Sequence, residues 1–292
     1  FAGQIGKYYI EKYANIKTEV YYASEYRYQK NFFDKDTLVI LISQSGETAD
    51  TLAAMKLANE HDIDTLSIVN RRDSSIARES KYVIYTPAGI EIAVATTKAY
   101  LAQVIILILL AIKNSSMEEE GIRELKLLPN IITKYINDFN YKEIAKLVSD
   151  KKNIFYLGRG IDYYLALEGS LKLKEISYIH SEAFAAGELK HGSISLIDEN
   201  FGVIAIVLDK SISDKTISNL KEVSSRGAEV IAITNIDKDD FSTHKILLDN
   251  HSEFLTPLTA IIPMQLLAYN TALIKGYDID KPRNLAKSVT VE

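Results

Sequence analysis

Small hydroxyl residues gather where an apolar segment of the chain ends. Ser43, Ser45 and Thr48 lie within the stretch SQSGET, and Gly46 stands among them. Hydroxyl groups and the free backbone amides of a helix N-terminus bind phosphate without a cation, and glycine lets the backbone approach closely. Alternatively, Ser45 or Thr48 only caps the helix that follows. The pattern thus indicates either a phosphate site or a helix cap.

A second hydroxyl-rich loop, AGIEIAVATTKAY at residues 88–100, also lies between a predicted strand and a predicted helix. Because both loops follow strands of one parallel sheet, we expect them at the same sheet edge. Thr96, Thr97 and Lys98 could then add contacts to a sugar or a phosphate. The alternative is again a capped helix.

Three ionisable residues, Glu168, Lys172 and Glu175, are spaced by four and three positions, so they share one face of a helix. Such a row of acid and amine groups could transfer protons beside a substrate. The commoner explanation of this spacing is a solvated Glu–Lys pair.

Two more groups suit acid–base or covalent chemistry. His191 lies in AAGELKHG between two glycines, which allow a tight loop that presents a side chain titrating near neutrality. The alternative is an exposed histidine without a role. Lys287 lies in the C-terminal segment DIDKPRNLAKSVTVE, where a desolvated amine could form a Schiff base with a carbonyl substrate if the segment folds back. Otherwise the segment is a frayed end.

The elements that position these residues occur twice in the chain. Residues 50–70 and 214–235 both read as a polar start, an amphipathic helix, a turn and a β-branched strand that ends in asparagine. The two asparagines, Asn70 and Asn235, are 165 positions apart. Ala23 and Ala186 are 163 positions apart, and Glu11 and Glu175 are 164 apart. This near-constant offset between the halves indicates two copies of one α/β unit.

Alternating short strands and helices predict parallel sheets covered by helices on both faces. The expected strands are residues 37–42, 65–69 and 82–86 in the first half, and residues 153–157, 202–208, 230–234 and 245–249 in the second half. The second half opens with a strand and a glycine turn before its first helix. Residue 1 already corresponds to the inside of that helix, so we expect one further strand and turn to precede it.

Composition excludes several classes of protein. The chain of 292 residues has no cysteine, which excludes disulfides and thiol nucleophiles and fits a reducing compartment such as the cytoplasm. A net charge of −5 without a basic cluster argues against a nucleic-acid partner. The longest apolar run, residues 104–112, is too short for a membrane span and predicts a buried helix. We recognise no signal peptide, no metal-ligand cluster and no GxGxxG turn, and we expect no metal or organic cofactor.

These motifs resemble one enzyme family. The stretches SQSGETADT, EIAVATTKAY, ALEGSLKLKEISYIHSEAFAAGELKHG and PRNLAKSVTVE are similar to the isomerase portion of the glucosamine-6-phosphate synthases, the isomerising glutamine–fructose-6-phosphate aminotransferases. That portion consists of two SIS (sugar isomerase) domains, and the resemblance covers residues 1–292. It implies a first SIS domain at residues 1–140, a second at residues 141–277, and a tail at residues 278–292 over the active site.

The resemblance also implies a role for each candidate residue. Glu175 would move the proton between C1 and C2 of the sugar, with Lys172 and Glu168 beside it. His191 would assist ring opening, and Lys287 would form the imine with the ketone. The residues expected to bind the phosphate and the sugar are Ser43, Gln44, Ser45, Thr48, Val94, Thr96 and Ala286.

Partners follow from the same resemblance. In the family, the histidine loop comes from the neighbouring subunit, so a homodimer is implied. The family usually has serine at the position of Thr96, and its Gly-Thr-Ser turn and its glutaminase domain would precede residue 1. Nitrogen would therefore come from a glutaminase domain of a longer parent chain or from free ammonia.

The expected reaction converts fructose 6-phosphate to glucosamine 6-phosphate, the entry to UDP-N-acetylglucosamine synthesis. It would run through ring opening, an imine at C2 and proton transfer from C1 to C2. Alternatives on the same scaffold are a SIS-type glucosamine-6-phosphate deaminase, a stand-alone phosphosugar isomerase and a non-catalytic phosphosugar sensor. Lys287 argues for the synthase, and a sensor would not need Glu175, His191 and Lys287 together.

Overall fold

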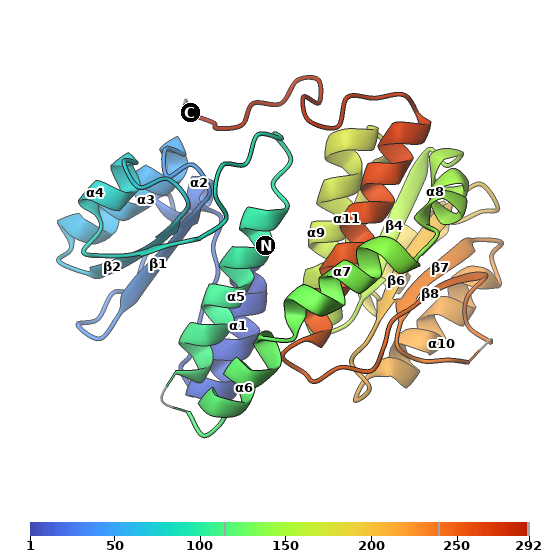
Figure 1. The fold of residues 1–292 in the computed structure, drawn as a ribbon, viewed down its shortest axis with the longest axis horizontal. Helices are drawn as coiled ribbons and strands as arrows, with labels where there is room; N and C mark the ends of the chain where they lie inside the picture. The colour runs from blue at the N-terminus through green and yellow to red at the C-terminus, as the bar shows by residue number, and fades with distance from the viewer. Residues whose placement is uncertain (114, 239, 291–292) are drawn as a thin grey trace. The chain divides into compact units, whose positions relative to one another are not determined.

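The structure is a computed structural model that describes residues 1–113, 115–238 and 240–290, apart from the side chain of Asp138. The chain forms two compact units (Figure 1). The first unit comprises Ala2–Lys113 and the C-terminal segment from Arg283, and the second comprises Phe1 and the chain between Lys113 and Arg283. The expected tail extends to residues 291 and 292, which lie outside the described residues.

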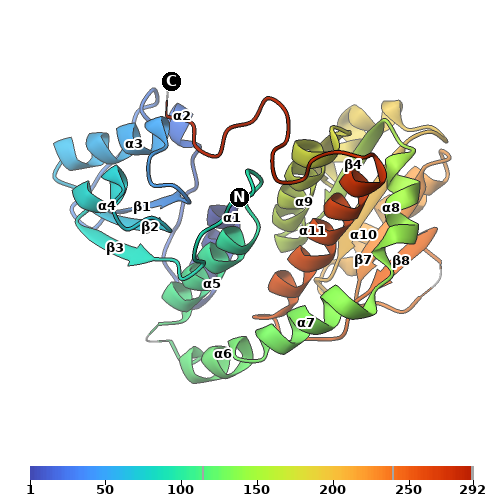
Figure 2. The ribbon, with the colours of Figure 1, turned by 45° about the horizontal axis from the view of Figure 1, so that its top comes forward.

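The first unit is built on a three-stranded parallel sheet of order β1-β2-β3. Its apolar, β-branched strands pack beneath α3 and α4, where Leu41, Met55, Val69 and Ile76 form the core. On another side, α1 packs against α5 (Figure 2). Its elements are α1 (Ala2–Tyr9), the π-helical η1 (Ile10–Ala14), α2 (Ala23–Tyr26), β1 (Leu38–Ser43), α3 (Ala49–Glu60), β2 (Asp64–Val69), α4 (Ser75–Glu79), β3 (Tyr82–Tyr85) and α5 (Lys98–Ile112).

The second unit contains a five-stranded parallel sheet of order β5-β4-β6-β7-β8. Alternate residues of its strands face opposite sides, so α9 packs on β4 and β5 while α10 packs on β6 and β7 (Figure 1). Its elements are α6 (Glu118–Leu125), α7 (Leu128–Asp138), α8 (Tyr141–Ser149), β4 (Asn153–Gly158), α9 (Ile161–Ser177), β5 (His180–Ala185), η2 (Glu188–His191), η3 (Ser193–Leu196), β6 (Gly202–Val207), α10 (Ser213–Ser224), β7 (Glu229–Thr234), β8 (His244–Leu247) and α11 (Thr256–Ile274).

The predicted α/β class with two related units is confirmed, and each of the seven predicted strands is present within two residues of its expected bounds. Sequence analysis places the boundary between the domains after residue 140. The structure instead groups α6 and α7 with the second unit, because α7 packs on α11.

One strand, β5, was not predicted. Its residues HSEAFA are mostly polar or small, and only Ser181 is fully buried, so the segment lacks the apolar signal of a core strand. The equivalent residues of the first unit, 17–22, form no strand. β5 depends on pairing with β4, and within the described residues no strand equivalent to β4 lies beside β1.

Two helices are apolar on most faces. α5, which contains the predicted buried run, packs against α1. α11 is long and apolar enough to cross a membrane by length and composition alone, but 72% of its apolar window is buried and it packs on α9, α8 and α7. That burial is typical of a core helix.

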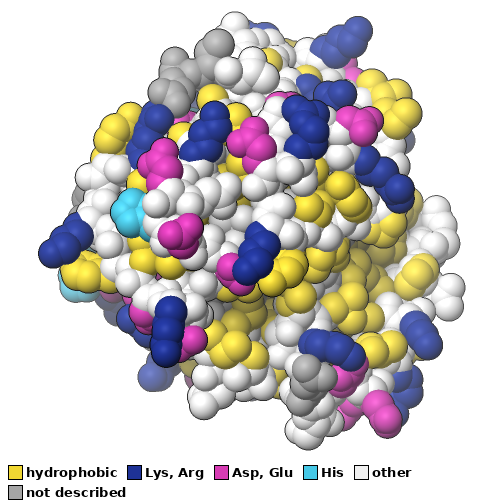
Figure 3. All heavy atoms as spheres, turned by 90° about the vertical axis from the view of Figure 1, so that its left-hand side faces the viewer, with side chains coloured by type: hydrophobic (Ala, Val, Ile, Leu, Met, Phe, Trp, Pro, Cys, Tyr) yellow, Lys and Arg dark blue, Asp and Glu magenta, His cyan; other side chains and the backbone are white. Residues whose placement is uncertain are grey.

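Charged side chains of both signs are interspersed over the face drawn in Figure 3. No patch of a single sign dominates this face. The expectation that the chain has no nucleic-acid partner stays a prediction.

Candidate active site

The hydroxyl-rich turn lies at the carboxyl end of β1, directly before α3. The Ser43 and Thr48 hydroxyl oxygens are 3.1 Å apart, and the Gly46 amide donates to Ser43 Oγ at 3.0 Å. The Glu47 amide donates to Ser45 Oγ at 3.2 Å. The turn therefore folds its hydroxyl groups inward around the helix N-terminus.

The structure does not support the simple capping interpretation of this turn. Thr48 is the N-cap residue of α3, yet its own side chain makes no capping hydrogen bond. The amide of Ala49, the first helical residue, instead donates to the carbonyl oxygen of Val289 in the C-terminal segment, at 3.1 Å. The Ser43–Thr48 hydroxyls are thus not used as helix caps, and the tail supplies one acceptor in their place.

Gly46 fixes the shape of the turn. Its φ of +65° lies in the left-handed region, which glycine adopts at least cost. A Cβ at this position would lie 2.1 Å from Ser74 Oγ. Ser74 in turn caps α4, because its hydroxyl accepts from the Ala77 amide. The phosphate-type turn and the start of α4 are therefore packed directly on each other.

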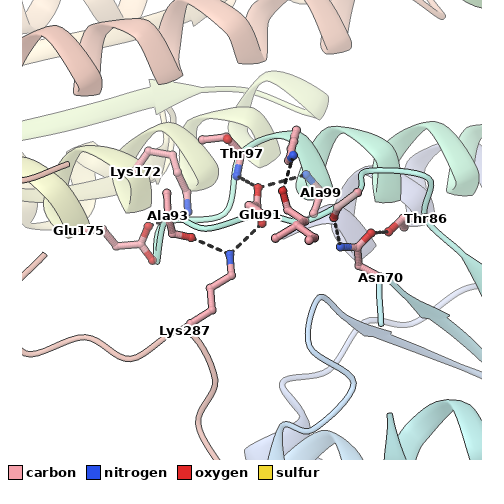
Figure 4. Close-up of polar contacts among 12 residues, drawn as sticks. Asn70, Thr86, Glu91, Ala93, Thr97, Ala99, Lys172, Glu175 and Lys287 are labelled. Atoms are coloured by element: carbon pink, nitrogen blue, oxygen red, sulfur yellow. Dashed lines mark hydrogen bonds and ion pairs between the residues drawn. The ribbon is translucent and has the colours of Figure 1, made fainter. Parts of the chain in front are cut away.

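The C-terminal segment folds back onto the first unit, as the sequence interpretation of Lys287 requires. Lys287 Nζ donates to Glu91 Oε2 at 2.9 Å and to the Ala93 carbonyl oxygen at 2.7 Å (Figure 4). The Ser288 hydroxyl donates to Ser45 Oγ at 3.0 Å. The frayed-end alternative is wrong for Lys287 and Ser288, because both have specific partners.

Glu91 organises the loop that receives Lys287. Its other oxygen, Oε1, accepts from the Thr97 amide at 2.9 Å and from the Ala99 amide at 3.4 Å, so it caps α5 from a distance (Figure 4). Burial favours the neutral acid, but the Thr97 amide and the Lys287 ammonium outweigh it and hold the pKa of Glu91 below its usual value. Glu91 is therefore an ionised, buried anchor for the lysine.

The first unit contains a cavity of about 630 Å³, which is lined by parts of the hydroxyl-rich turn, of the tail and of the loop that carries Glu91. Gln44 and Ser45 come from the turn after β1, and Lys287 and Ser288 come from the tail. Gly89, Ile90 and Glu91 belong to the loop of residues 88–100, which was expected at this sheet edge. The remaining lining residues, which were not expected there, are Asn70, Arg71, Arg72, Thr86 and Pro87. Turns after all three strands thus meet at one cavity, as expected for the carboxyl edge of a parallel sheet.

Asn70 links two of these turns. Its side-chain amide donates to the Gly89 carbonyl oxygen at 2.8 Å, and its oxygen accepts from Thr86 Oγ1 at 2.8 Å (Figure 4). In the sequence, Asn70 stands out only as the end of one repeat. Its place at the end of a strand was the signal that could have marked it as a loop-positioning residue.

The acid–amine row in the second unit is confirmed on one face of α9. Lys172 Nζ lies 2.6 Å from Glu175 Oε2 and 3.6 Å from Glu168 Oε1. Glu168 is only 3% exposed and Lys172 only 4%, so the solvated-pair explanation is wrong. Burial raises the pKa of Glu168 although Lys172 acts in the opposite direction. Glu168 and Lys172 are thus a buried ion pair, and Glu175 extends it toward solvent; clusters of this kind are more frequent at functional sites than elsewhere.

His191 ends the short η2 helix and is exposed. Within the described residues, no hydrogen bond or ion pair joins it to Glu168, Lys172 or Glu175. Its expected role is therefore still untested by geometry.

The remaining expected sugar contacts are less defined. Val94 and Thr96 lie half-buried in the loop before α5, and Ala286 is exposed next to Lys287. The described residues that line the cavity include none of these three. Their assignment to the sugar stays a prediction.

A family model described as SIS domain matches residues 1–113 and 147–275. The chain belongs to the SIS domain family. Each matched segment corresponds to one of the two sheets, so both units are SIS domains.

Among curated proteins, this chain is similar to isomerising aminotransferases. The isomerising glutamine–fructose-6-phosphate aminotransferases of Clostridium tetani and Caldanaerobacter subterraneus are 49% and 48% identical to this SIS chain, over 100% of its length and 50% of theirs. The chain thus spans about half the length of these relatives. The resemblance to the isomerising aminotransferases is confirmed.

The fold is also similar to the folds of solved structures. The C-terminal domain of glucosamine-fructose-6-phosphate aminotransferase from Francisella tularensis is 40% identical, with a TM-score of 0.91 over 96% of this chain and 82% of that one. A glucosamine-6-phosphate deaminase from Thermotoga maritima is 24% identical, with a TM-score of 0.79 over 99% and 86% of the two chains. The second likeness shows a shared fold and no more.

Proposed function

We propose that this pair of SIS domains converts fructose 6-phosphate to glucosamine 6-phosphate. The observation that carries the proposal is the docking of Lys287 and Ser288 beside the hydroxyl-rich turn, in one cavity. An amine suited to imine formation is thereby placed next to donors suited to a phosphate. The similarity to aminotransferases that act on fructose 6-phosphate supports the same assignment.

The phosphate would bind at the turn before α3. Ser43, Gln44, Ser45 and Thr48 would supply hydroxyl and amide donors, and the N-terminus of α3 would add its partial positive charge. Val94, Thr96 and Ala286 would contact the sugar. The tail of residues 278–292 would cover the active site.

The chemistry would fall to groups from both SIS domains. His191 would assist ring opening, and Lys287 Nζ would attack C2 of the open ketone with loss of water to give an imine. Ammonia would then add to C2 and release the free lysine, which leaves a C2 imine that carries the nitrogen of the product. Glu175 would take the proton from C1 and return it at C2, with Lys172 and Glu168 beside it on the same helix face. The Lys172 ammonium, 2.6 Å from Glu175 Oε2, would stabilise the carboxylate. A protonated lysine cannot attack, so the Lys287 ammonium that Glu91 holds must lose a proton before the imine forms.

The finer assignments are part of the same proposal. The chain would act as a cytoplasmic homodimer in which the His191 loop serves the neighbouring subunit. Nitrogen would come from a glutaminase domain or from free ammonia. These 292 residues contain no cysteine, so they cannot hydrolyse glutamine with a thiol nucleophile.

An assay with ammonium tests the function. The chain is incubated with fructose 6-phosphate and ammonium chloride, and glucosamine 6-phosphate and water are the expected products. The reverse incubation, with glucosamine 6-phosphate alone, measures ammonia release. If ammonia is released faster than glucosamine 6-phosphate is formed at matched substrate concentrations, the result would favour the deaminase. If the sugar phosphate binds tightly but neither reaction occurs, the result would favour the sensor.

Glu91→Gln is expected to lower turnover by about 10²-fold while the dissociation constant of fructose 6-phosphate changes little, because a misplaced amine reacts slowly. Glutamine can still accept the two loop amides, but it cannot form the ion pair with Lys287. In the wild type, the pKa of Glu91 is below the usual glutamate pKa, so above that usual value Glu91 is fully ionised and the ion pair with Lys287 is present. As the pH falls, the pair is lost only when the pH passes through the lowered pKa of Glu91. The measurements are turnover, calorimetric affinity and hydrogen exchange of the tail.

Glu60→Gln is the matched control, because Glu60 is an exposed glutamate at the end of α3. It should leave turnover and tail exchange unchanged. If Glu91→Gln left tail protection and turnover at wild-type values, Glu91 would not position the lysine.

A further inference from the structure

Two turns of the second unit, the glycine-containing turn after β4 and the polar turn after β6, lie next to each other. Ligands bind at this point in sheets of this topology. In the order β5-β4-β6-β7-β8, the chain passes from β4 to a neighbour on one side and then returns to β6 on the other. The carboxyl ends of β4 and β6 therefore frame the crevice at the topological switch point. A ligand site is expected there.

A carboxylate of the chain itself occupies this position. Asp162, in the first turn of α9, accepts hydrogen bonds at Oδ2 from the Leu208 amide at 2.9 Å and from the Asp209 amide at 3.1 Å. The residue is 2% exposed. Its other oxygen, Oδ1, has no hydrogen-bond partner within the described part of the chain. A carboxylate from the β4 turn thus sits on the backbone donors of the β6 turn.

The same donors form the candidate phosphate turn in the first unit. β1 corresponds to β6, since Ser43 and Val207 end these strands 164 positions apart. Leu208 and Asp209 therefore correspond to Gln44 and Ser45. The first turn would bind the phosphate of a ligand, whereas the second turn binds the carboxylate of Asp162.

Side-chain differences fit this division. The hydroxyl residues Ser43, Ser45 and Thr48 correspond to Val207, Asp209 and Ile212. The second turn has thus lost the hydroxyl donors that a free phosphate would use. Asp209 also adds a second carboxylate, whose Oδ1 accepts from the Ser211 amide at 2.9 Å and would repel an incoming anion.

Glycine lets α9 bring its carboxylate this close. A Cβ on Gly158, the last residue of β4, would lie 2.4 Å from the backbone carbonyl oxygen of Asp162. The turn can therefore fold tightly enough to place Asp162 over the β6 turn only because residue 158 has no side chain.

We infer that the second SIS domain retains an oxyanion site of the same construction as the phosphate turn of the first, and that Asp162 is its resident anion. The carboxylate is attached to the chain, so it binds without the entropy cost of capturing a free ion. It ties the turn after β4 to the turn after β6 and closes the crevice to outside ligands. Burial raises the pKa of Asp162 to about 7, although the Leu208 and Asp209 amides act in the opposite direction.

Chemical rescue tests whether Asp162 occupies an oxyanion site. The comparison with the first turn rests on the proposed phosphate site, but the rescue of Asp162→Ala does not depend on any enzymatic activity of the chain. Asp162→Ala removes one carboxylate group, and formate has the same charged group. At pH 8, replacing chloride by formate at equal ionic strength, up to about 0.2 M, should raise the unfolding midpoint of Asp162→Ala by about 3 °C or more. Formate should also slow amide hydrogen exchange at Leu208 and Asp209 in this variant.

Wild type and Asp214→Ala are the controls. Asp214 is exposed at the start of α10 and does not hydrogen-bond the Leu208 and Asp209 amides. Any formate that binds the first unit affects all three proteins equally, so the difference between variants is the measurement. If Asp162→Ala is unfolded in chloride, formate should restore folding. An equal response of all three proteins, or a variant that stays unfolded in formate, would overturn the inference.

Discussion

Glu175→Gln is expected to reduce exchange of the C1 proton of fructose 6-phosphate with solvent by about 10²- to 10⁴-fold, the usual contribution of a general base. Glutamine has nearly the same shape as glutamate but cannot accept the proton. The proposed phosphate donors lie in the other SIS domain, on the turn after β1, so the dissociation constant of the sugar phosphate should change little. Proton exchange is followed by NMR in D₂O and affinity by calorimetry.

Glu182→Gln provides the comparison, because Glu182 is an exposed glutamate of β5 in the same domain. It should retain wild-type exchange. Loss of affinity together with residual proton exchange in Glu175→Gln would contradict the role of Glu175 as the base.

Gly46→Ala is expected to abolish detectable binding of the sugar phosphate and to destabilise the first domain by about 3 kcal/mol or more, as the sum of left-handed backbone strain and steric overlap. The added Cβ would meet Ser74 Oγ at 2.1 Å and Ser74 Cβ at 2.5 Å. Ser74 cannot move away freely, since it caps α4. Denaturant unfolding and calorimetry measure the two effects.

Gly276→Ala separates backbone strain from overlap. Gly276 has a similar φ of +72°, and a Cβ there would meet no atom within 4 Å. Gly276→Ala should therefore lower the free energy of unfolding only by the backbone strain, about 1–2 kcal/mol, and it should leave the sugar-phosphate affinity unchanged. Equal costs at the two glycines would show that the contact with Ser74 does not constrain the turn.

Local patterns predicted most of the fold. The β-branched strands and the offset of 163–165 residues predicted two parallel sheets. A buried strand leaves its signal in adjacent residues, and a repeat leaves a constant offset. β5 was missed because it is polar and depends on pairing with β4, which is a tertiary effect. The row on α9 was found because residues three and four apart share a helix face.

The site was predicted only in part for the same reason. Lys287 and Ser45 were named, but their partners Glu91 and Ser288 were not. Glu91 and Lys287 lie 196 residues apart, and Glu91 stands between two isoleucines in a loop, so no local pattern links the pair. Asp162 escaped notice because its partners are backbone amides 46 and 47 residues away, and backbone donors leave no trace in a sequence.

Imine trapping tests the central claim, that Lys287 is the amine delivered to the sugar held by the Ser43–Thr48 turn. The chain is incubated with fructose 6-phosphate, reduced with sodium borohydride and digested for mass spectrometry. We expect a deoxyhexitol phosphate on Nζ of Lys287, and its yield should fall when excess inorganic phosphate competes for the turn. A label on another lysine, or labelling of Lys287 that phosphate does not affect, would contradict the account.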